Sequence, residues 1–112
     1  MASDILAIGP YTVGEKPAPL EYQFLKSDGT PEDLTGWSAR FAYRRSDSTA
    51  TVVNATVTDG PAGRVTYTWT GDELSTAGTW WCEFWVGNTS NRYASKRLEA
   101  TVRVPVGGPP AI

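Results

Sequence analysis

Apolar and polar residues alternate in several short runs along this chain, and turns rich in Gly, Pro, Asp and Asn separate the runs. Alternation with a period of two is typical of strands that bury one face. The runs are LEYQFL at 20–25, WSARFAYRR at 37–45, TVVNATVTD at 51–59, RVTYTW at 64–69, GTWWCEFWV at 78–86 and RYASKRLEATVRV at 92–104. Together with a short edge strand near residues 11–13, the pattern predicts an all-β antiparallel sandwich of about seven strands.

A single helical turn is predicted between these strands, at TGDEL in residues 70–74. Thr70 and Glu73 there have the spacing of a capping box. We expect Leu74 to enter the core below this turn. Leu34 is the one apolar residue able to anchor the loop of residues 26–36 to the core.

The length of 112 residues indicates one domain. We expect an extended N-terminal arm over residues 1–19, the sandwich over residues 20–104 and a C-terminal Pro/Gly tail over residues 105–112. Pro-rich and Gly-rich ends are normally ordered only where something holds them. The arms are therefore expected to lie along neighbouring subunits, and the alternative is that they pack on their own domain.

The run GTWWCEFWV has large apolar residues on both sides of one strand. We expect Trp80, Cys82, Phe84 and Val86 to face the core, since the chain holds 13 aromatic residues (5 Trp, 5 Tyr and 3 Phe) to fill it. Cys82 then acts as a small buried hydrophobe. The odd-numbered residues of the same strand, which include two Trp, must point outward.

If strands 37–45, 78–86 and 92–104 share one sheet, its outer face carries Arg40, Arg44, Trp81, Glu83, Trp85, Arg97, Glu99, Thr101 and Arg103. One interpretation is a cross-strand ladder in which guanidinium groups stack on indole rings and the two Glu neutralise them, or a cover formed by the chain's own ends. The other is a partner surface, because Trp and Arg are enriched among the residues that anchor protein contacts. The candidate interface residues are Trp81, Trp85, Arg40, Arg44, Glu83, Arg97 and Arg103.

Composition excludes several classes of function. The formal charge of −2 argues against a nucleic-acid partner, and no polybasic segment suits an anionic membrane. One Cys and no His leave no intrachain disulfide, no usual zinc site and no Ser–His or Cys–His nucleophile pair. The N-terminus lacks the pattern of a signal peptide, so we expect a soluble protein made in a cytoplasm.

Acidic residues gather in DGTPEDL and GDEL, but neither stretch fits a calcium loop. Turn chemistry explains Asp28, and the start of the predicted turn explains Asp72 and Glu73. A small sandwich offers little room for a cleft with paired carboxylates. We therefore expect no catalytic residues, no cofactor and no metal.

Two resemblances add to this interpretation. Trp80 and Cys82 occupy the places of the aromatic residue and the Cys on strand F of immunoglobulin-like domains, although the partner Cys is missing. A wider one covers roughly residues 22–104. It consists of an acidic-Gly turn at Asp28-Gly29, then DLTG at 33–36, the hairpin of Asp59 with GRVTY at 63–67, DEL at 72–74, and GTWWCEFWV at 78–86. In order and spacing these motifs resemble the N-terminal domain of phage baseplate upper proteins.

This resemblance implies an immunoglobulin-like sandwich in the virion of a tailed phage. We expect a non-enzymatic structural protein, either a minor tail or baseplate-type adaptor or a capsid decoration protein, made in the bacterial host cytoplasm. Its partners would be capsid, tail or baseplate subunits, and it would be oligomeric in the particle. The alternative is a carbohydrate-binding module that uses exposed Trp to adhere to host-surface glycans, but Trp81 and Trp85 have mainly Arg and Glu as neighbours, which favours a protein partner.

Overall fold

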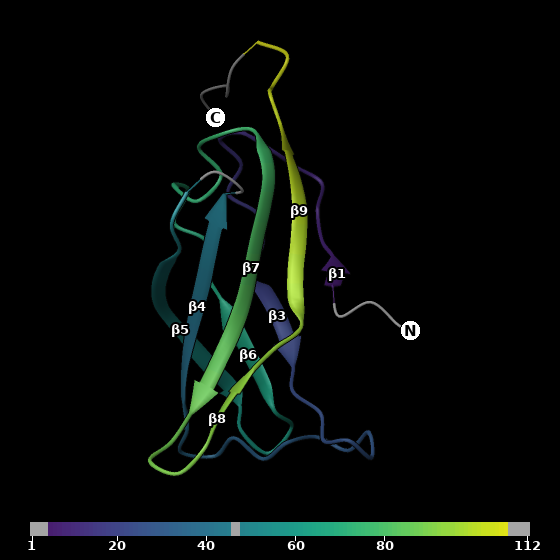
Figure 1. Cartoon of the computed structure of the whole chain (residues 1–112), viewed down its shortest axis with the longest axis vertical. Coiled ribbons are helices and arrows are strands. Elements are labelled where there is room, and N and C mark those ends of the chain that lie inside the picture. Colours follow the sequence, from purple (N-terminus) through teal and green to yellow (C-terminus); the bar gives the residue numbers. More distant parts are fainter. Residues whose placement is uncertain (1–4, 46–47, 108–112) are drawn as a thin grey trace.

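The computed structural model of the chain describes residues 5–45 and 48–107, and this part contains nine strands and no helix. The strands are β1 (Ile5–Ala7), β2 (Tyr11–Thr12), β3 (Leu20–Gln23), β4 (Ser38–Arg45), β5 (Thr51–Asp59), β6 (Arg64–Tyr67), β7 (Gly78–Gly87), β8 (Arg92–Ala94) and β9 (Arg97–Arg103). They form one curled sheet in the order β1-β9-β7-β4-β5-β6-β3 (Figure 1). In addition, β2 pairs with β9 and β8 pairs with β7. The predicted all-β class is confirmed.

Strand β5 carries the sheet from one layer to the other. Residues 51–55 pair with β4, whereas Thr56, Val57 and Asp59 pair with β6, with a register shift between Val57 and Asp59. In Figure 1, β3 and β6 lie behind β4, β7 and β9. The two layers enclose the core, an arrangement compatible with an immunoglobulin-like sandwich.

Aromatic side chains fill the space between the layers. Phe41 is fully buried, stacks on Tyr67 with ring centroids 4.1 Å apart, and lies 5.0 Å from the ring of Phe84. The buried apolar residues are Phe24, Leu34, Ala39, Phe41, Val65, Tyr67, Trp69, Leu74, Trp80, Cys82, Phe84, Val86, Leu98, Ala100 and Val102. The predicted inward side of GTWWCEFWV is confirmed, as are the buried positions of Leu34 and Leu74.

The segment 70–74 is a turn, and the predicted helical turn is wrong. Glu73 is buried, and its carboxylate accepts hydrogen bonds from the backbone N–H groups of Thr70 and Gly71 and from the hydroxyl of Tyr67. The contact with Thr70 is half of a capping box. Because Tyr67 draws the same carboxylate into the core, the chain closes a local turn and Leu74 enters the core without helical winding.

The predicted strand over 92–104 is broken at Ser95, which separates β8 from β9. The N–H of Phe84 donates to the Ser95 hydroxyl at 2.9 Å, so a side chain takes the place of a backbone carbonyl in the ladder. The Ser95 hydroxyl in turn donates to the carbonyl of Lys96 at 2.8 Å. A period of two continued from Val102 would turn Val104 inward, but Val104 is 71% exposed because β9 ends at Arg103 and Pro105 follows.

The described part of the N-terminal segment lies on its own domain. β1 and β2 both run parallel to β9, and β1 lies beside β9 at the edge of the layer (Figure 1). The ring of Tyr11 packs edge-on against Trp69 at 5.4 Å. The edge strand expected near residues 11–13 is observed as β2. Strand β1 was not predicted, because its three residues are too few to show a period of two. The outermost parts of the expected arms, residues 1–4 and 108–112, lie outside the described residues.

Gly63 lets the loop of residues 26–36 approach the hairpin between β5 and β6. Its φ is +70°, and a Cβ there would lie 2.6 Å from the carbonyl oxygens of both Phe24 and Glu32. The carbonyl of Gly63 accepts a hydrogen bond from Phe24, and Leu34 donates to Gly60. A side chain at position 63 would separate these backbones.

Candidate interaction surface

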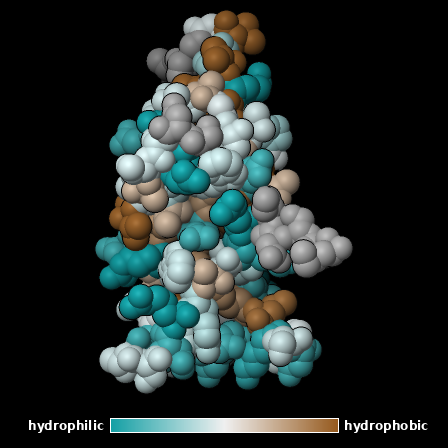
Figure 2. Space-filling model, viewed as in Figure 1, coloured by the Kyte–Doolittle hydropathy of each residue, from teal (hydrophilic) through white to brown (hydrophobic). Residues whose placement is uncertain are grey.

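The outer face predicted from the sequence lies on the layer of β4, β7 and β9. Strands β4 and β7 pair so that Arg44 lies opposite Trp81 and Arg40 lies opposite Trp85. On the other side of β7, Trp81 lies opposite Glu99. Figure 2 shows this side of the molecule, where hydrophilic residues predominate and apolar residues are scattered among them.

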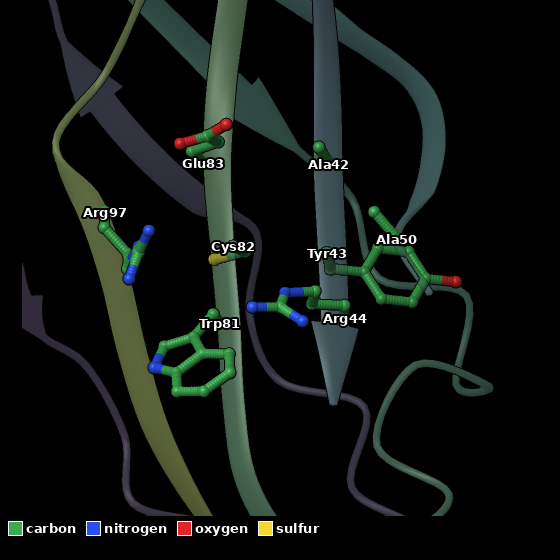
Figure 3. A pocket seen from close by; sticks show the side chains of 8 residues that line it. All are labelled: Ala42, Tyr43, Arg44, Ala50, Trp81, Cys82, Glu83 and Arg97. Carbon is green, nitrogen blue, oxygen red and sulfur yellow. The ribbon is translucent and has the colours of Figure 1, made fainter. Parts of the chain in front are cut away.

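Trp81 is the centre of a cation–π cluster. The guanidinium carbon of Arg44 lies 4.8 Å from the centroid of the indole ring, and that of Arg97 lies 5.9 Å from it. Both distances fall within the range of about 6 Å over which a guanidinium is attracted to an aromatic face. Figure 3 shows the three side chains converging from β4, β7 and β9. The sequence-based prediction of an Arg–Trp ladder is therefore correct at Trp81.

Trp85 is held differently. Its indole N–H donates to the Glu83 carboxylate at 2.8 Å, and the side chain is 37% exposed. The guanidinium of Arg40 donates to the carbonyl of Ala39 at 3.0 Å, and no cation–π contact joins Arg40 to Trp85 within the described residues. The Glu83 carboxylate, predicted to neutralise the arginines, orients Trp85 and also lines the depression beside Arg44 and Arg97.

Two depressions lie on this face and share Ala42. The smaller one, about 110 Å³, is lined by Arg44, Trp81, Glu83 and Arg97, with Ala50 at one side (Figure 3). The larger one, about 890 Å³, is open and lined by residues that include Arg40, Val52, Trp85 and Arg92. Val52 is 61% exposed.

Sequence reasoning missed Val52 and Arg92. Val52 could have been found, because Val53, Ala55 and Val57 point inward and leave Val52 on the outward side of β5. Arg92 could not have been found, because in a continuous strand it would lie on the same, inward side as the buried Leu98. The break at Ser95 shifts the phase by one residue, so even-numbered positions point outward in β8 and odd-numbered ones in β9.

The remaining chemistry-bearing residues have local structural roles. Burial, reinforced by the nearby Glu83 charge, raises the pKa of the Cys82 thiol far above its ordinary value, which leaves it a poor nucleophile. Asp28 accepts hydrogen bonds from the N–H and hydroxyl of Thr30, and Asp33 does the same with Thr35, which lowers the pKa of both carboxyls. Among the described residues, no group of three His, Cys, Asp or Glu gathers as a metal site would require.

A comparison with models of known protein families finds a match. The model of the BppU (baseplate upper protein) N-terminal domain matches residues 18–104. The chain belongs to this family. No curated protein matches the sequence.

Two solved structures share the fold of this BppU N-terminal domain. The N-terminal domain of phage TP901-1 ORF48 superimposes with a TM-score of 0.63 at 13% identity, covering 88% of this chain and 94% of that one. CopC from Methylosinus trichosporium OB3b gives a TM-score of 0.53 at 15% identity, covering 84% of this chain and 83% of that one. At such identities these likenesses support the all-β fold alone.

Family membership confirms the predicted resemblance and makes this chain a bacteriophage structural domain of the baseplate type. The motif residues of the resemblance have structural roles: Gly63 allows a close backbone approach, Leu34 and Leu74 anchor loops, and Asp28 and Asp33 close turns. No helix in the described part of this BppU domain has the length and apolar character needed to span a membrane.

Proposed function

We propose that this BppU-type domain is a non-enzymatic structural component of a tailed-phage particle, acting as a minor tail or baseplate-type adaptor or as a capsid decoration protein. It is made in the host cytoplasm and joins other virion proteins through its outer face. The observation that carries the proposal is the arrangement of Trp81 and Trp85. Both lie on the solvent side of a layer whose inner side is already filled by aromatic residues.

The geometry suits a docking surface. Trp85 is exposed yet oriented by Glu83, and Trp81 is held between strands by two arginines. A partner that covers these rings therefore loses little side-chain entropy, which favours affinity. Few residues carry most of the energy at such surfaces, and each costs about 2 kcal/mol or more when truncated.

The experiment compares particles of a phage that lacks this gene, complemented with different versions of the chain. Purified particles should contain the wild-type chain in fixed ratio to the other virion proteins, as measured by quantitative mass spectrometry. Trp81→Ala with Trp85→Ala should reduce its content by at least about 30-fold, because a loss of about 2 kcal/mol at either ring alone implies that factor. Leu25→Ala, which is 55% exposed on a different part of the surface, is the matched control and should be incorporated normally.

Absence of the wild-type chain from purified particles would refute the virion role. Normal incorporation of the double Trp variant would refute the assignment of this face. If the wild-type chain is present in particles, an electron-microscopy map would distinguish tail, baseplate, head-tail joint and capsid positions. In the carbohydrate-binding alternative, glycan-array binding would be present and would be lost on Trp85→Ala.

A further inference from the structure

Charge is unevenly distributed between the outer face and the rest of the protein. The outward-facing residues of β4, β7, β8 and β9 include five arginines (Arg40, Arg44, Arg92, Arg97 and Arg103) and two glutamates (Glu83 and Glu99). This face therefore has a formal charge of +3, whereas the whole chain has −2, which leaves −5 for the remainder. A basic face on an acidic protein attracts acidic partners and disfavours basic ones.

The two arginines at Trp81 keep their hydrogen-bond donors available. A guanidinium carries five N–H donors, and its attraction to an aromatic ring requires no conventional hydrogen bond from them. Within residues 5–45 and 48–107, the contact recorded for Arg44 and for Arg97 is the one with the indole ring. The carboxylate of Glu83 receives the indole N–H of Trp85. Among the described residues, these two guanidinium forks thus have no carboxylate partner, the group whose geometry they match best.

The space between these arginines is of suitable size. The depression lined by Arg44, Trp81 and Arg97 also has Glu83 in its wall, and its volume is about 110 Å³. A depression of this size holds several water molecules and so has room for the carboxylate group of one side chain. In Figure 3 the Arg44 and Arg97 side chains lie at the two sides of Trp81, with Ala42 and Ala50 as small neighbours.

The second depression repeats this chemistry further along β4. Arg40 and Arg92 line it together with the exposed ring of Trp85. Arg40 precedes Arg44 by four residues on the same side of the strand, a separation of about 13 Å at the usual rise of about 3.3 Å per residue. A partner that covers both depressions therefore meets a pair of arginines beside a Trp in each of them.

We infer that the partner of this face is an acidic surface of a different virion protein. One of its carboxylates binds between Arg44 and Arg97, and a second, about 13 Å away, meets Arg40 and Arg92. The apolar part of the partner packs on Trp85. This inference rests on the proposed virion role and deepens it by naming the chemistry of the partner.

Charge reversal in the complemented phage tests the inference. Arg44→Glu combined with Arg97→Glu should lower the content of the chain in purified particles by at least about tenfold, because two attractive contacts become repulsive. The matched control is Lys26→Glu with Arg64→Glu, which makes the same charge change at exposed positions outside the outer face and should be incorporated normally. Arg44→Lys retains the charge but loses the fork, and incorporation should fall by a smaller factor. Circular dichroism of the purified variants verifies that they are folded.

The partner can be identified by cross-linking within the particle. A photo-crosslinking amino acid in place of Thr101, which is exposed on β9, should link to a peptide rich in Asp and Glu from another virion protein. Equal incorporation of the folded double variants, or a link to a neutral or basic peptide or to a second copy of this chain, would overturn the inference. In each of these cases the chain is still found in the particle, so the proposed function stands. Only absence of the wild-type chain from particles would refute both.

Discussion

The cluster of Trp81 with Arg44 and Arg97 makes a quantitative prediction about stability. At exposed sites one guanidinium–indole contact contributes about 0.5–1 kcal/mol, and the attraction weakens toward a limit near 6 Å. Arg44 lies 4.8 Å from the ring centroid and Arg97 lies 5.9 Å from it. The coupling of Trp81 with Arg44 should therefore be about 0.5–1 kcal/mol, and that with Arg97 clearly smaller.

A double-mutant cycle measures each coupling separately. The variants are Trp81→Ala, Arg44→Ala, Arg97→Ala and the two double variants, and urea unfolding followed by circular dichroism gives the free energy of unfolding of each. Arg40 with Trp85 is the matched control pair, because the two face each other in register but form no cation–π contact in the described part of the chain. Its coupling should be near zero.

Either of two results would refute the reasoning. One is an Arg44–Trp81 coupling no larger than that of the control pair. The other is an Arg97–Trp81 coupling larger than the Arg44–Trp81 coupling. The same variants separate the two interpretations of the outer face. Substitutions that lower stability without changing incorporation into particles indicate a ladder that serves the fold. Substitutions that lower incorporation without changing stability indicate a docking surface.

Three further predictions concern the interior and the turns. Burial raises the pKa of Glu73, but hydrogen bonds from Tyr67, Thr70 and Gly71 outweigh burial and hold this pKa below its ordinary value of 4.5. The ionised carboxylate therefore stabilises the fold above pH 4.5, and this stabilisation is lost as the pH falls through the lowered pKa of the folded protein. Glu73→Gln should cost about 1–3 kcal/mol at pH 7 and flatten the acid limb of the urea midpoint against pH, and an unchanged limb would contradict this. Gly63→Ala should lower the free energy of unfolding by more than Gly29→Ala, since both have positive φ but only the former meets backbone oxygens at 2.6 Å; equal losses would show that the close approach is unimportant. Cys82 should react with a thiol reagent only after urea unfolding, and rapid labelling of the folded protein would contradict its burial.

The core and the layer that bears the outer face could be predicted from the sequence, because period-two alternation is strong in the runs that form β4 and β7. Phe41 and Phe84 are buried and lie in register, as their alternation with polar or outward residues requires. Short-range patterns failed where a side chain replaces a backbone group in the hydrogen-bond network. Ser95 interrupts the ladder in this way, and Glu73 closes a turn that resembles a helix start in its residue types. Ser95 contacts Phe84 on the neighbouring strand and Glu73 contacts the Tyr67 hydroxyl in the core, and apolar periodicity specifies neither contact.

The two-sided aromatic strand follows from how this small protein is stabilised. With a single Cys, the fold relies on packing, and the inner side of β7 contributes Trp80 and Phe84 to a network of rings that also holds Phe41 and Trp69. This inner packing fixes the backbone of β7 and so fixes where the outward indoles point. The register with β4 and β9 then brings Arg44 and Arg97 to Trp81, while the break at Ser95 turns Arg92 outward beside Trp85. The position of the outer face is thus a consequence of core packing, and a core substitution that shifts β7 should weaken the proposed docking without changing any residue of that face.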